Sequence, residues 1–239
     1  MLRFGRLIGT QVRRMEPRMK ITIKDVSSDE CIVQATETLN RGNIIAIPTD
    51  TIYGVAGLAQ NSDAISKIYE LKNRNPEKPI AICVADIEDV FKWGKVTLSI
   101  NQLHELLPGP VTLLFERTNA LNADLNPKTS IVGIRIPDHN FVRQLVRCCG
   151  GPLALTSANI SSTRSTLAIQ EFKDIWPKLD MVCDGGILGD TLESRAGSTV
   201  VDLSKQGQFK IVREGSAYKE TVNKLVKNFN LQDTTQPDS

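Results

Sequence analysis

The apolar residues of this 239-residue chain come in short runs, each of a length that suits a β-strand. A short apolar run bounded by turn residues is typical of a strand that is buried on both faces. We expect strands at NIIAI (43–47), PIAICVA (79–85), VTLLFER (111–117), SIVGIRIP (130–137), LALT (153–156), MVCD (181–184), STVVDL (198–203) and FKIVR (209–213). No run approaches the ~20 apolar residues that span a bilayer, so the sequence predicts no membrane insertion.

Segments with apolar residues at helical spacing lie between these runs. The first covers residues 27–41, where Ser27 or Ser28 can cap the start and Gly42 ends the helix. We expect further helices at 63–72, at 139–149 with Asp138 as its cap, at 168–175 and at 217–229. Helices and strands alternate, but several strands follow one another directly. The sequence therefore predicts a single α/β domain over residues 20–230, with a twisted mixed parallel and antiparallel sheet flanked by helices.

The two ends of the chain differ in composition from this body. Residues 1–15, MLRFGRLIGTQVRRM, hold four arginines and no acidic residue. That balance is typical of a mitochondrial targeting segment, although such segments are usually also rich in serine and this one is not. The stretch 1–19 is therefore either a targeting segment or a disordered basic extension. The expected location is the cytoplasm, with a mitochondrial fraction if the segment is a signal. The polar residues 231–239 are predicted to be a disordered tail.

The charge and the missing motifs exclude several classes of site. The formal net charge is +2, whereas a nucleic-acid-binding domain is usually clearly basic. Neither G-x-x-x-x-G-K-[ST] nor G-x-G-x-x-G is present, so neither standard glycine loop would hold a nucleotide. The five cysteines form no C-x-x-C pair, and His104 and His139 are not at zinc-ligand spacing from them. We therefore expect no metal site built by the protein alone.

Two polar segments have a composition that suits ligands. Residues 48–54, PTDTIYG, follow a strand and precede a glycine-containing loop. Threonine hydroxyls and backbone N–H groups at a strand end can bind a carboxylate or an amino group. Residues 72–79, KNRNPEKP, place Lys72, Arg74 and Lys78 within seven residues, which suits polyphosphate oxygens. A plain turn explains the first segment equally well, and a solvated helix end explains the second.

Three further features are polar residues in or beside predicted strands. Arg135 interrupts the run IVGIRIP, and it either faces solvent or holds an anion at the sheet surface, because a buried charge needs a partner. TSAN at 156–159 offers small hydroxyls and an amide, which is also ordinary turn chemistry. Ser198 begins STVVDL and Arg213 ends FKIVR. None of these elements is specific by itself, but their order along the chain is.

Taken in order, these motifs resemble the YrdC-domain family, the threonylcarbamoyl-AMP synthases. The family pattern is PT-[ED]-T-x-Y-G-L, K-x-R-P-x-x-x-P-L, V-x-V-R-x-P, S-A-N, S-T-V-V-D and R-x-G. This sequence has PTDTIYGVA, KNRNPEKPI, VGIRIP, TSAN, STVVDL and REG. RAGSTVVDL and EFKDIWPKLDMVCDGG look particularly like the animal members. Asn75 departs from the pattern, as do Cys83, where some members have histidine, and ISSTRST, which replaces the usual L-S-G-x-P-S.

The resemblance implies an enzyme that joins L-threonine, bicarbonate and ATP into threonylcarbamoyl-AMP and releases pyrophosphate. The product would serve N6-threonylcarbamoyladenosine formation beside the tRNA anticodon, through a separate transferase complex downstream. Mg²⁺ would accompany the phosphates, held mostly by ATP and water. Carried over, the catalytic residues are Lys72, Arg74 and Arg135, the threonine-binding residues are Thr51, Ser157 and Ser198, and the ATP-binding residues are Arg74, Lys78, Asn159 and Arg213.

Elementary chemistry agrees with this implication. The threonine amine must first become a carbamate, and that anion must then approach the α-phosphate of a second anion. Preorganised cations are needed to bring the negative charges together, and Lys72, Arg74, Lys78 and Arg135 can supply them. No covalent nucleophile is required, and positioning alone can contribute ~7–11 kcal/mol.

Two other functions compete with this reading. The same lysines and arginines could hold tRNA or double-stranded RNA by its phosphates, as a binding module without catalysis or as weak binding beside it. The near-neutral charge and the lack of interleaved basic and aromatic residues argue against that module. The second is a non-catalytic carbamoyl-adenylate-binding domain of a larger carbamoyltransferase, whose accessory domains exceed the length of this chain.

Overall fold

The computed structural model describes residues 21–235, apart from 73–78, 160–163, 190 and 192. The strands are β1 (Thr22–Asp25), β2 (Ile45–Ile47), β3 (Gly54–Leu58), β4 (Ala81–Cys83), β5 (Gly94–Lys95), β6 (Val111–Arg117), β7 (Ile131–Arg135), β8 (Leu153–Ser157), β9 (Met181–Asp184), β10 (Thr199–Asp202), β11 (Gln208–Arg213) and β12 (Gln232–Asp233). The helices are α1 (Asp29–Asn40), α2 (Ser62–Leu71), α3 (Ile87–Trp93), α4 (Ile100–Leu106), α5 (Asn140–Cys149) and α6 (Tyr218–Asn223), with 3-10 segments η1 (Ile169–Lys178) and η2 (Glu193–Arg195) and a π-helical turn η3 (Lys224–Asn228).

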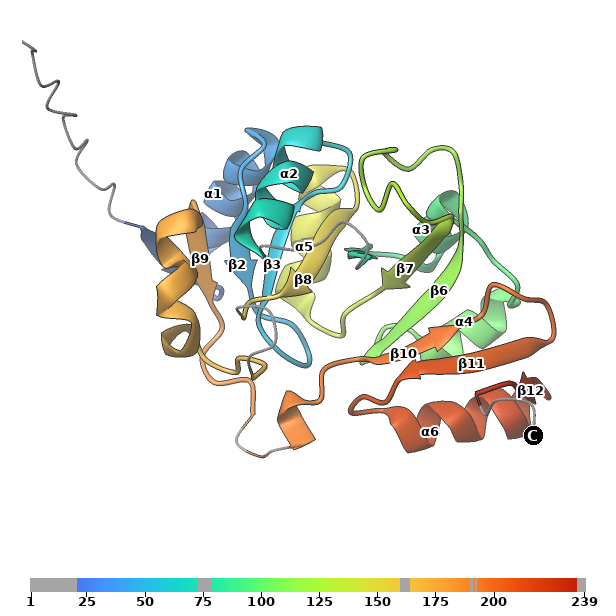
Figure 1. Ribbon diagram of the computed structural model, residues 1–239. Coiled ribbons are helices and arrows are strands. Elements are labelled where there is room, and N and C mark those ends of the chain that lie inside the picture. The colour runs from blue at the N-terminus through green and yellow to red at the C-terminus, as the bar shows by residue number, and fades with distance from the viewer. Residues whose placement is uncertain (1–20, 73–78, 160–163, 190, 192, 236–239) are drawn as a thin grey trace, which may run out of the picture.

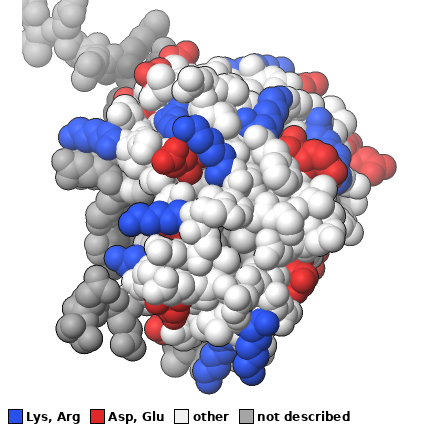
Figure 2. Space-filling model, turned by 90° about the vertical axis from the view of Figure 1, so that its right-hand side faces the viewer, with Lys and Arg blue, Asp and Glu red and all other residues white. Residues whose placement is uncertain are grey.

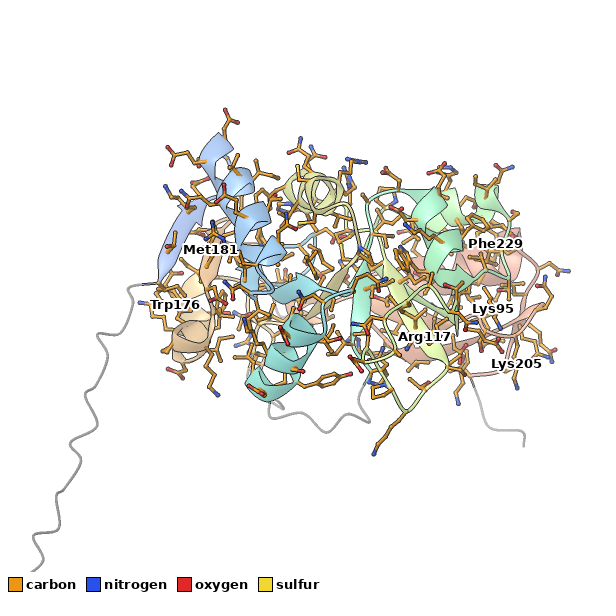
Figure 3. All side chains as sticks on the ribbon, turned by 90° about the horizontal axis from the view of Figure 1, so that it is seen from above. Lys95, Arg117, Trp176, Met181, Lys205 and Phe229 are labelled. Carbon is orange, nitrogen blue, oxygen red and sulfur yellow. The ribbon has the colours of Figure 1, made fainter. Side chains whose placement is uncertain are left out.

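Within the described residues, the strands form one mixed sheet in the order β1-β9-β2-β3-β8-β4-β7-β6-β10-β11-β12, with β5 beside β6 (Figure 1). β2 is parallel to β9 and antiparallel to β3, and β4 is parallel to β7 and antiparallel to β8. Figure 3 shows the length of the sheet, with Met181 and Trp176 at one end and Phe229 and Lys205 at the other. The prediction of a single α/β domain with a mixed sheet flanked by helices is confirmed.

The central strands are buried on both faces, which explains why their sequences are continuously apolar. Successive side chains of a strand point to opposite faces. In β2, Ile45 and Ile47 therefore join a core with α1 and α5, whereas Ala46 joins a second core with α2. The second core also includes residues of α3, α4 and η3.

The predicted helix ends are correct at α1 and wrong at α5. The Oγ atom of Ser28 accepts a hydrogen bond from Cys31 N at 3.2 Å, and Gly42 takes a left-handed φ of 74° just after the helix. At α5 the N-cap is His139 and not Asp138. The Asp138 carboxylate accepts a hydrogen bond from Arg143 Nη1 at 2.9 Å, so it pairs with a cation in the first turn and leaves the backbone uncapped.

Several short elements differ from the prediction. The glycine-containing stretch after PTDTIYG is strand β3 and not a loop, because it pairs with both β2 and β8. Gly54 lets β3 pack closely against β8, since a Cβ there would lie 2.7 Å from Leu155 Cδ1. The predicted disordered tail is wrong for residues 231–235, since β12 pairs with β11 and Thr235 Oγ1 accepts from Ile211 N at 2.9 Å. Residues 236–239 and the N-terminal stretch 1–19 lie outside the described residues.

Among the residues that the structure describes, no helix combines the length and the apolar character needed to cross a bilayer.

Candidate functional site

A cavity of about 360 Å³ opens over the middle of the sheet. Its floor includes Thr112 and Leu114 of β6 and Gly133 and Arg135 of β7, residues two apart that share one face of their strands. Gly133 keeps the floor open, because a Cβ there would lie only 3.1 Å from both Thr112 Cγ2 and Leu114 Cδ2.

The structure brings most of the predicted site residues together at this cavity. It is lined by Lys72, Arg135, Ser157, Asn159, Ser198 and Arg213, which come from five separate segments of the chain. Thr51 is buried and reaches the cavity wall through a hydrogen bond from Arg135. Arg74 and Lys78 lie outside the described residues.

The PTDTIYG segment forms a tight turn between the antiparallel strands β2 and β3. Thr49 Oγ1 donates to Ile52 O at 2.7 Å and accepts from Thr51 N at 3.1 Å. The Tyr53 hydroxyl donates to Gly186 O at 2.8 Å and accepts from Gly185 N at 2.9 Å. Burial raises the pKa of Tyr53, so this hydroxyl stays protonated and fixes the turn to the segment after β9.

Arg135 is buried at the cavity wall and does not face solvent; only 6% of the residue is exposed. Its Nη2 atom donates to Asp50 Oδ1 at 2.5 Å and to Thr51 Oγ1 at 3.0 Å. Burial lowers the pKa of Arg135 and the charge of Asp50 opposes that effect. Arg135 Nε and Asp50 Oδ2 are buried without a hydrogen-bond partner among the described residues, so this ion pair retains polar capacity for a ligand or for water.

Lys72 connects the end of α2 to the TSAN turn. Its Nζ atom donates to Ser157 O at 2.9 Å, to Asn159 O, and to Asn159 Oδ1 at 3.1 Å. The Ser157 hydroxyl also donates to Asn159 Oδ1 at 2.5 Å. The lysine therefore brings a buried positive charge to the cavity and orients the two TSAN side chains that the sequence assigned to ligand binding.

Ser198 and Arg213 meet because β10 lies between β6 and β11, with Val200 opposite both Thr112 and Arg213. Arg213 Nη2 donates to Ser198 O at 2.8 Å and to Ser198 Oγ at 3.0 Å. The pKa of Arg213 is lowered, first by desolvation and then by the positive charge of Arg135. Its described hydrogen bonds go to neutral atoms only, so its charge is not balanced within the described protein.

One charged residue and one hydroxyl residue of the site were not assigned from the sequence, and a third, polar residue supports it. Asp50, between two threonines of a turn motif, gave no sign that it would pair with Arg135 some 85 residues away. Thr112 was not assigned to the site because it is a single hydroxyl residue within the strand VTLLFER. Asn126 is 1% exposed and forms hydrogen bonds with Tyr69 of α2 and with the backbone of Ile80. It thereby connects the described chain before residue 73 to the described chain after residue 78.

Cys83 lies beside Arg135 in the β4–β7 pair but takes no part in the cavity lining. It is fully buried, and burial raises its pKa to about 12. A thiol in that state is a poor nucleophile. This is consistent with a reaction that forms no covalent bond to the protein.

A second hollow of about 290 Å³ adjoins the cavity through Asn159. Arg195 and Glu171 line it and are joined by two hydrogen bonds of 2.7 Å. The bonded Arg195 lowers the pKa of Glu171 to about 2. The Thr166 hydroxyl also lines this hollow and is buried without a partner among the described residues.

No carboxylate appears among the described residues that line the main cavity, and no group of His, Cys, Asp and Glu in the described chain could hold a metal ion. The lining is therefore suited to anions and neutral polar groups.

Comparison with known proteins gives a consistent picture. A family model for Sua5, YciO and YrdC, described as "Telomere recombination", matches residues 37–215. A protein of Mus musculus named threonylcarbamoyl-AMP synthase is 48% identical over 204 residues, which are 84% of this chain and 73% of the mouse protein. A Bacillus subtilis protein of the same name is 30% identical over 84% of this chain and 58% of its own length.

Solved structures resemble the fold. Pyrococcus abyssi Sua5 complexed with L-threonine is 25% identical, with a TM-score of 0.77 over 90% of this chain and 62% of that protein. Escherichia coli YciO, at 23% identity, has a TM-score of 0.71 over 82% of this chain and 94% of its own.

Proposed function

The chain belongs to the Sua5/YciO/YrdC family, and from that premise we propose that it is a threonylcarbamoyl-AMP synthase. The reaction would join L-threonine, bicarbonate and ATP: the amine and bicarbonate form a carbamate with loss of water, and the carbamate oxygen displaces pyrophosphate from the α-phosphate of ATP. The relatives of the same name and the threonine-bound Sua5 structure support this proposal.

The observation that carries the proposal is the charge of the cavity. Lys72, Arg135 and Arg213 line it, whereas the described lining contains no carboxylate. Asp50 pairs with Arg135 in the cavity wall. Such an excess of positive charge is unfavourable without anions and becomes favourable when they bind. Carbamate and triphosphate together supply those anions.

The geometry suggests a role for each side of the cavity. We assign the amino acid to the end with Thr51 and Ser198, where Arg135 can hold a carboxylate or the developing carbamate. The nucleotide lies against Lys72, Asn159 and Arg213. Arg74 and Lys78, which lie outside the described residues, are proposed from the sequence to hold its phosphates. Charge-assisted hydrogen bonds from fixed cations then align the carbamate oxygen with the α-phosphorus, and the positive charges stabilise the transition state.

Mg²⁺ and bicarbonate are part of the proposal. Mg²⁺ prefers oxygen ligands, chiefly carboxylates and phosphates, and the described cavity lining offers no carboxylate. We therefore propose that the ion arrives with ATP and is held by its phosphates and by water. Bicarbonate would enter as a co-substrate at the Arg135 side.

The reaction is tested by pyrophosphate release. Purified protein with ATP, Mg²⁺ and bicarbonate is expected to release pyrophosphate when L-threonine is added, and release should stop when EDTA removes Mg²⁺ or when bicarbonate is depleted. Leucine and lysine serve as control amino acids. Pyrophosphate release that is independent of threonine, or none at all, would contradict the proposal.

The product implies a partner downstream. We propose that a separate complex transfers the threonylcarbamoyl group to an adenosine beside the tRNA anticodon. Stable RNA binding by this chain has less support, because Lys and Arg side chains are interspersed with Asp and Glu on the face shown in Figure 2. Weak affinity for tRNA that falls steeply with salt would be compatible with both roles.

We also propose that the protein acts in the cytoplasm and that residues 1–15 direct a fraction to mitochondria. The support is their four arginines and the absence of acidic residues. A fluorescent protein fused after residue 20 is expected to enter mitochondria, and a version with the four arginines changed to glutamine is expected to stay outside. Equal distribution of the two fusions would show that the segment is not a signal.

A further inference from the structure

Thr112 places a buried hydroxyl at the cavity, in a strand that the sequence analysis read as an apolar run. The residue is 5% exposed and lines the cavity. Its Oγ1 atom lies 2.8 Å from Ser198 Oγ. A buried hydroxyl is costly unless it forms hydrogen bonds. Among the described residues, Ser198 is the one hydrogen-bond partner of this hydroxyl, and Ser198 itself lines the cavity.

The methyl group of Thr112 fixes the direction of its hydroxyl. Cγ2 lies over Gly133, so that a Cβ added at this glycine would be 3.1 Å from it. A β-branched side chain has few χ1 rotamers, and the methyl group already occupies the space that Gly133 leaves. The hydroxyl is thereby turned toward Ser198.

Counting the hydrogen-bond donors and acceptors shows what the two hydroxyls of Thr112 and Ser198 can still bind. Each hydroxyl has one hydrogen and two lone pairs. The bond between Thr112 and Ser198 uses one hydrogen and one lone pair, whichever residue donates. Arg213, which can only donate, uses a second lone pair on Ser198 Oγ. The pair therefore retains one O–H donor and two acceptor lone pairs.

We propose that Thr112 and Ser198 together recognise the side-chain hydroxyl of the amino-acid substrate, and that Thr112 is a specificity-determining residue. This inference rests on the proposed function. A ligand hydroxyl can both donate and accept, so it matches the remaining capacity of the pair. A carboxylate would use the single donor but would face the lone pairs, and Arg135 and Lys72 are better partners for it. A methyl group in that place would leave the pair unsatisfied.

The test compares Thr112→Val, which keeps the shape and loses the hydroxyl, with Thr112→Ser, which keeps the hydroxyl. Pyrophosphate release is measured with L-threonine and with L-2-aminobutyrate, which lacks the hydroxyl. In the wild-type chain kcat/KM should strongly favour threonine, because a site built to bond a hydroxyl rejects the analogue without it. Thr112→Val is expected to lower kcat/KM for threonine about 10- to 100-fold and to change the value for 2-aminobutyrate far less.

The ratio of the two kcat/KM values decides the outcome. Thr112→Ser should retain the wild-type ratio within about threefold. A Thr112→Val protein that loses rate equally on both amino acids would overturn the inference, because a purely structural defect does not distinguish the substrates. Calorimetry that measures the affinity for each amino acid without turnover tests this inference separately from the proposed reaction. Selective threonine binding that depends on the Thr112 hydroxyl, without pyrophosphate release, would leave the subsite standing and overturn the reaction.

Discussion

Replacing Arg135 by glutamine is expected to reduce threonine-dependent pyrophosphate release by at least about 100-fold, the usual effect of removing one preorganised donor from a transition state. The protein should also lose about 3–5 kcal/mol of unfolding free energy, because Asp50 would keep a buried charge without its partner. Steady-state kinetics and urea denaturation measure the two effects.

A double variant separates catalysis from stability at this pair. Asp50→Asn combined with Arg135→Gln removes both charges and leaves two neutral amide side chains that can bond each other. Stability should return to within about 1.5 kcal/mol of the wild type, as when a buried pair is exchanged for neutral groups. Activity should remain low, because the lost cation is needed by the ligand. Recovery of both quantities in the double variant would show that Arg135 serves the fold alone.

The buried ion pair also illustrates what a sequence of this kind conceals. The sequence left two alternatives for Arg135, solvent exposure or an anion at the sheet surface, and the structure places it in the cavity wall beside Asp50. The choice depends on a contact between residues about 85 positions apart, which the turn at residues 48–54 creates. Local composition carries no information about such a contact.

Elements with strong periodicity were predictable, whereas short ones depended on tertiary packing. The strand predicted at 111–117 has the same bounds as β6, whose residues pair with β10, β7 or β5. Helices α3 and α4 were not predicted, since seven residues make too few turns to display a helical period. The helix expected at 217–229 divides into α6 and the π-helical turn η3. The two-residue strand β12 forms by pairing with β11, a contact that local sequence does not indicate.

Candidate site residues were predictable where a motif contained several polar groups. PTDTIYG, TSAN and the Ser198–Arg213 pair all reach the cavity, with Thr51 behind its wall. Thr112 was not found because its polarity is a single hydroxyl within an apolar strand. Its role depends on Gly133 and Ser198, which come from other strands and loops.

The glycine of the REG sequence has a physical requirement that leads to the second large effect. A Cβ at Gly215 would lie 2.3 Å from both the carbonyl carbon of Ser198 and the nitrogen of Thr199. Atoms of two backbone segments cannot approach so closely, and neither backbone can turn away as a flexible side chain would. The close approach lets Ser216 N donate to Gly197 O at 2.9 Å, just before Ser198.

Gly215→Ala is therefore expected to displace the Ser198 segment from Arg213 and from Thr112. We expect a loss of about 1–3 kcal/mol in unfolding free energy from overpacking. Turnover should fall at least about tenfold, since the two hydrogen bonds from Arg213 Nη2 to Ser198 and the contact with Thr112 depend on that position. Denaturation and pyrophosphate kinetics on the same preparation measure both quantities.

Gly151→Ala is the matched control, because a Cβ at Gly151 would have no heavy atom within 4 Å and this glycine is not in the left-handed region. It should alter stability by no more than about 0.5 kcal/mol and leave turnover unchanged. If Gly215→Ala behaved like this control, Ser198 would not depend on the Gly215 contact. The presence of both STVVDL and REG in this sequence would then not be explained by their contact. If the two variants differ as expected, REG serves to position STVVDL, and Arg213 and Gly215 both act on Ser198, the first by hydrogen bonds and the second by close backbone approach.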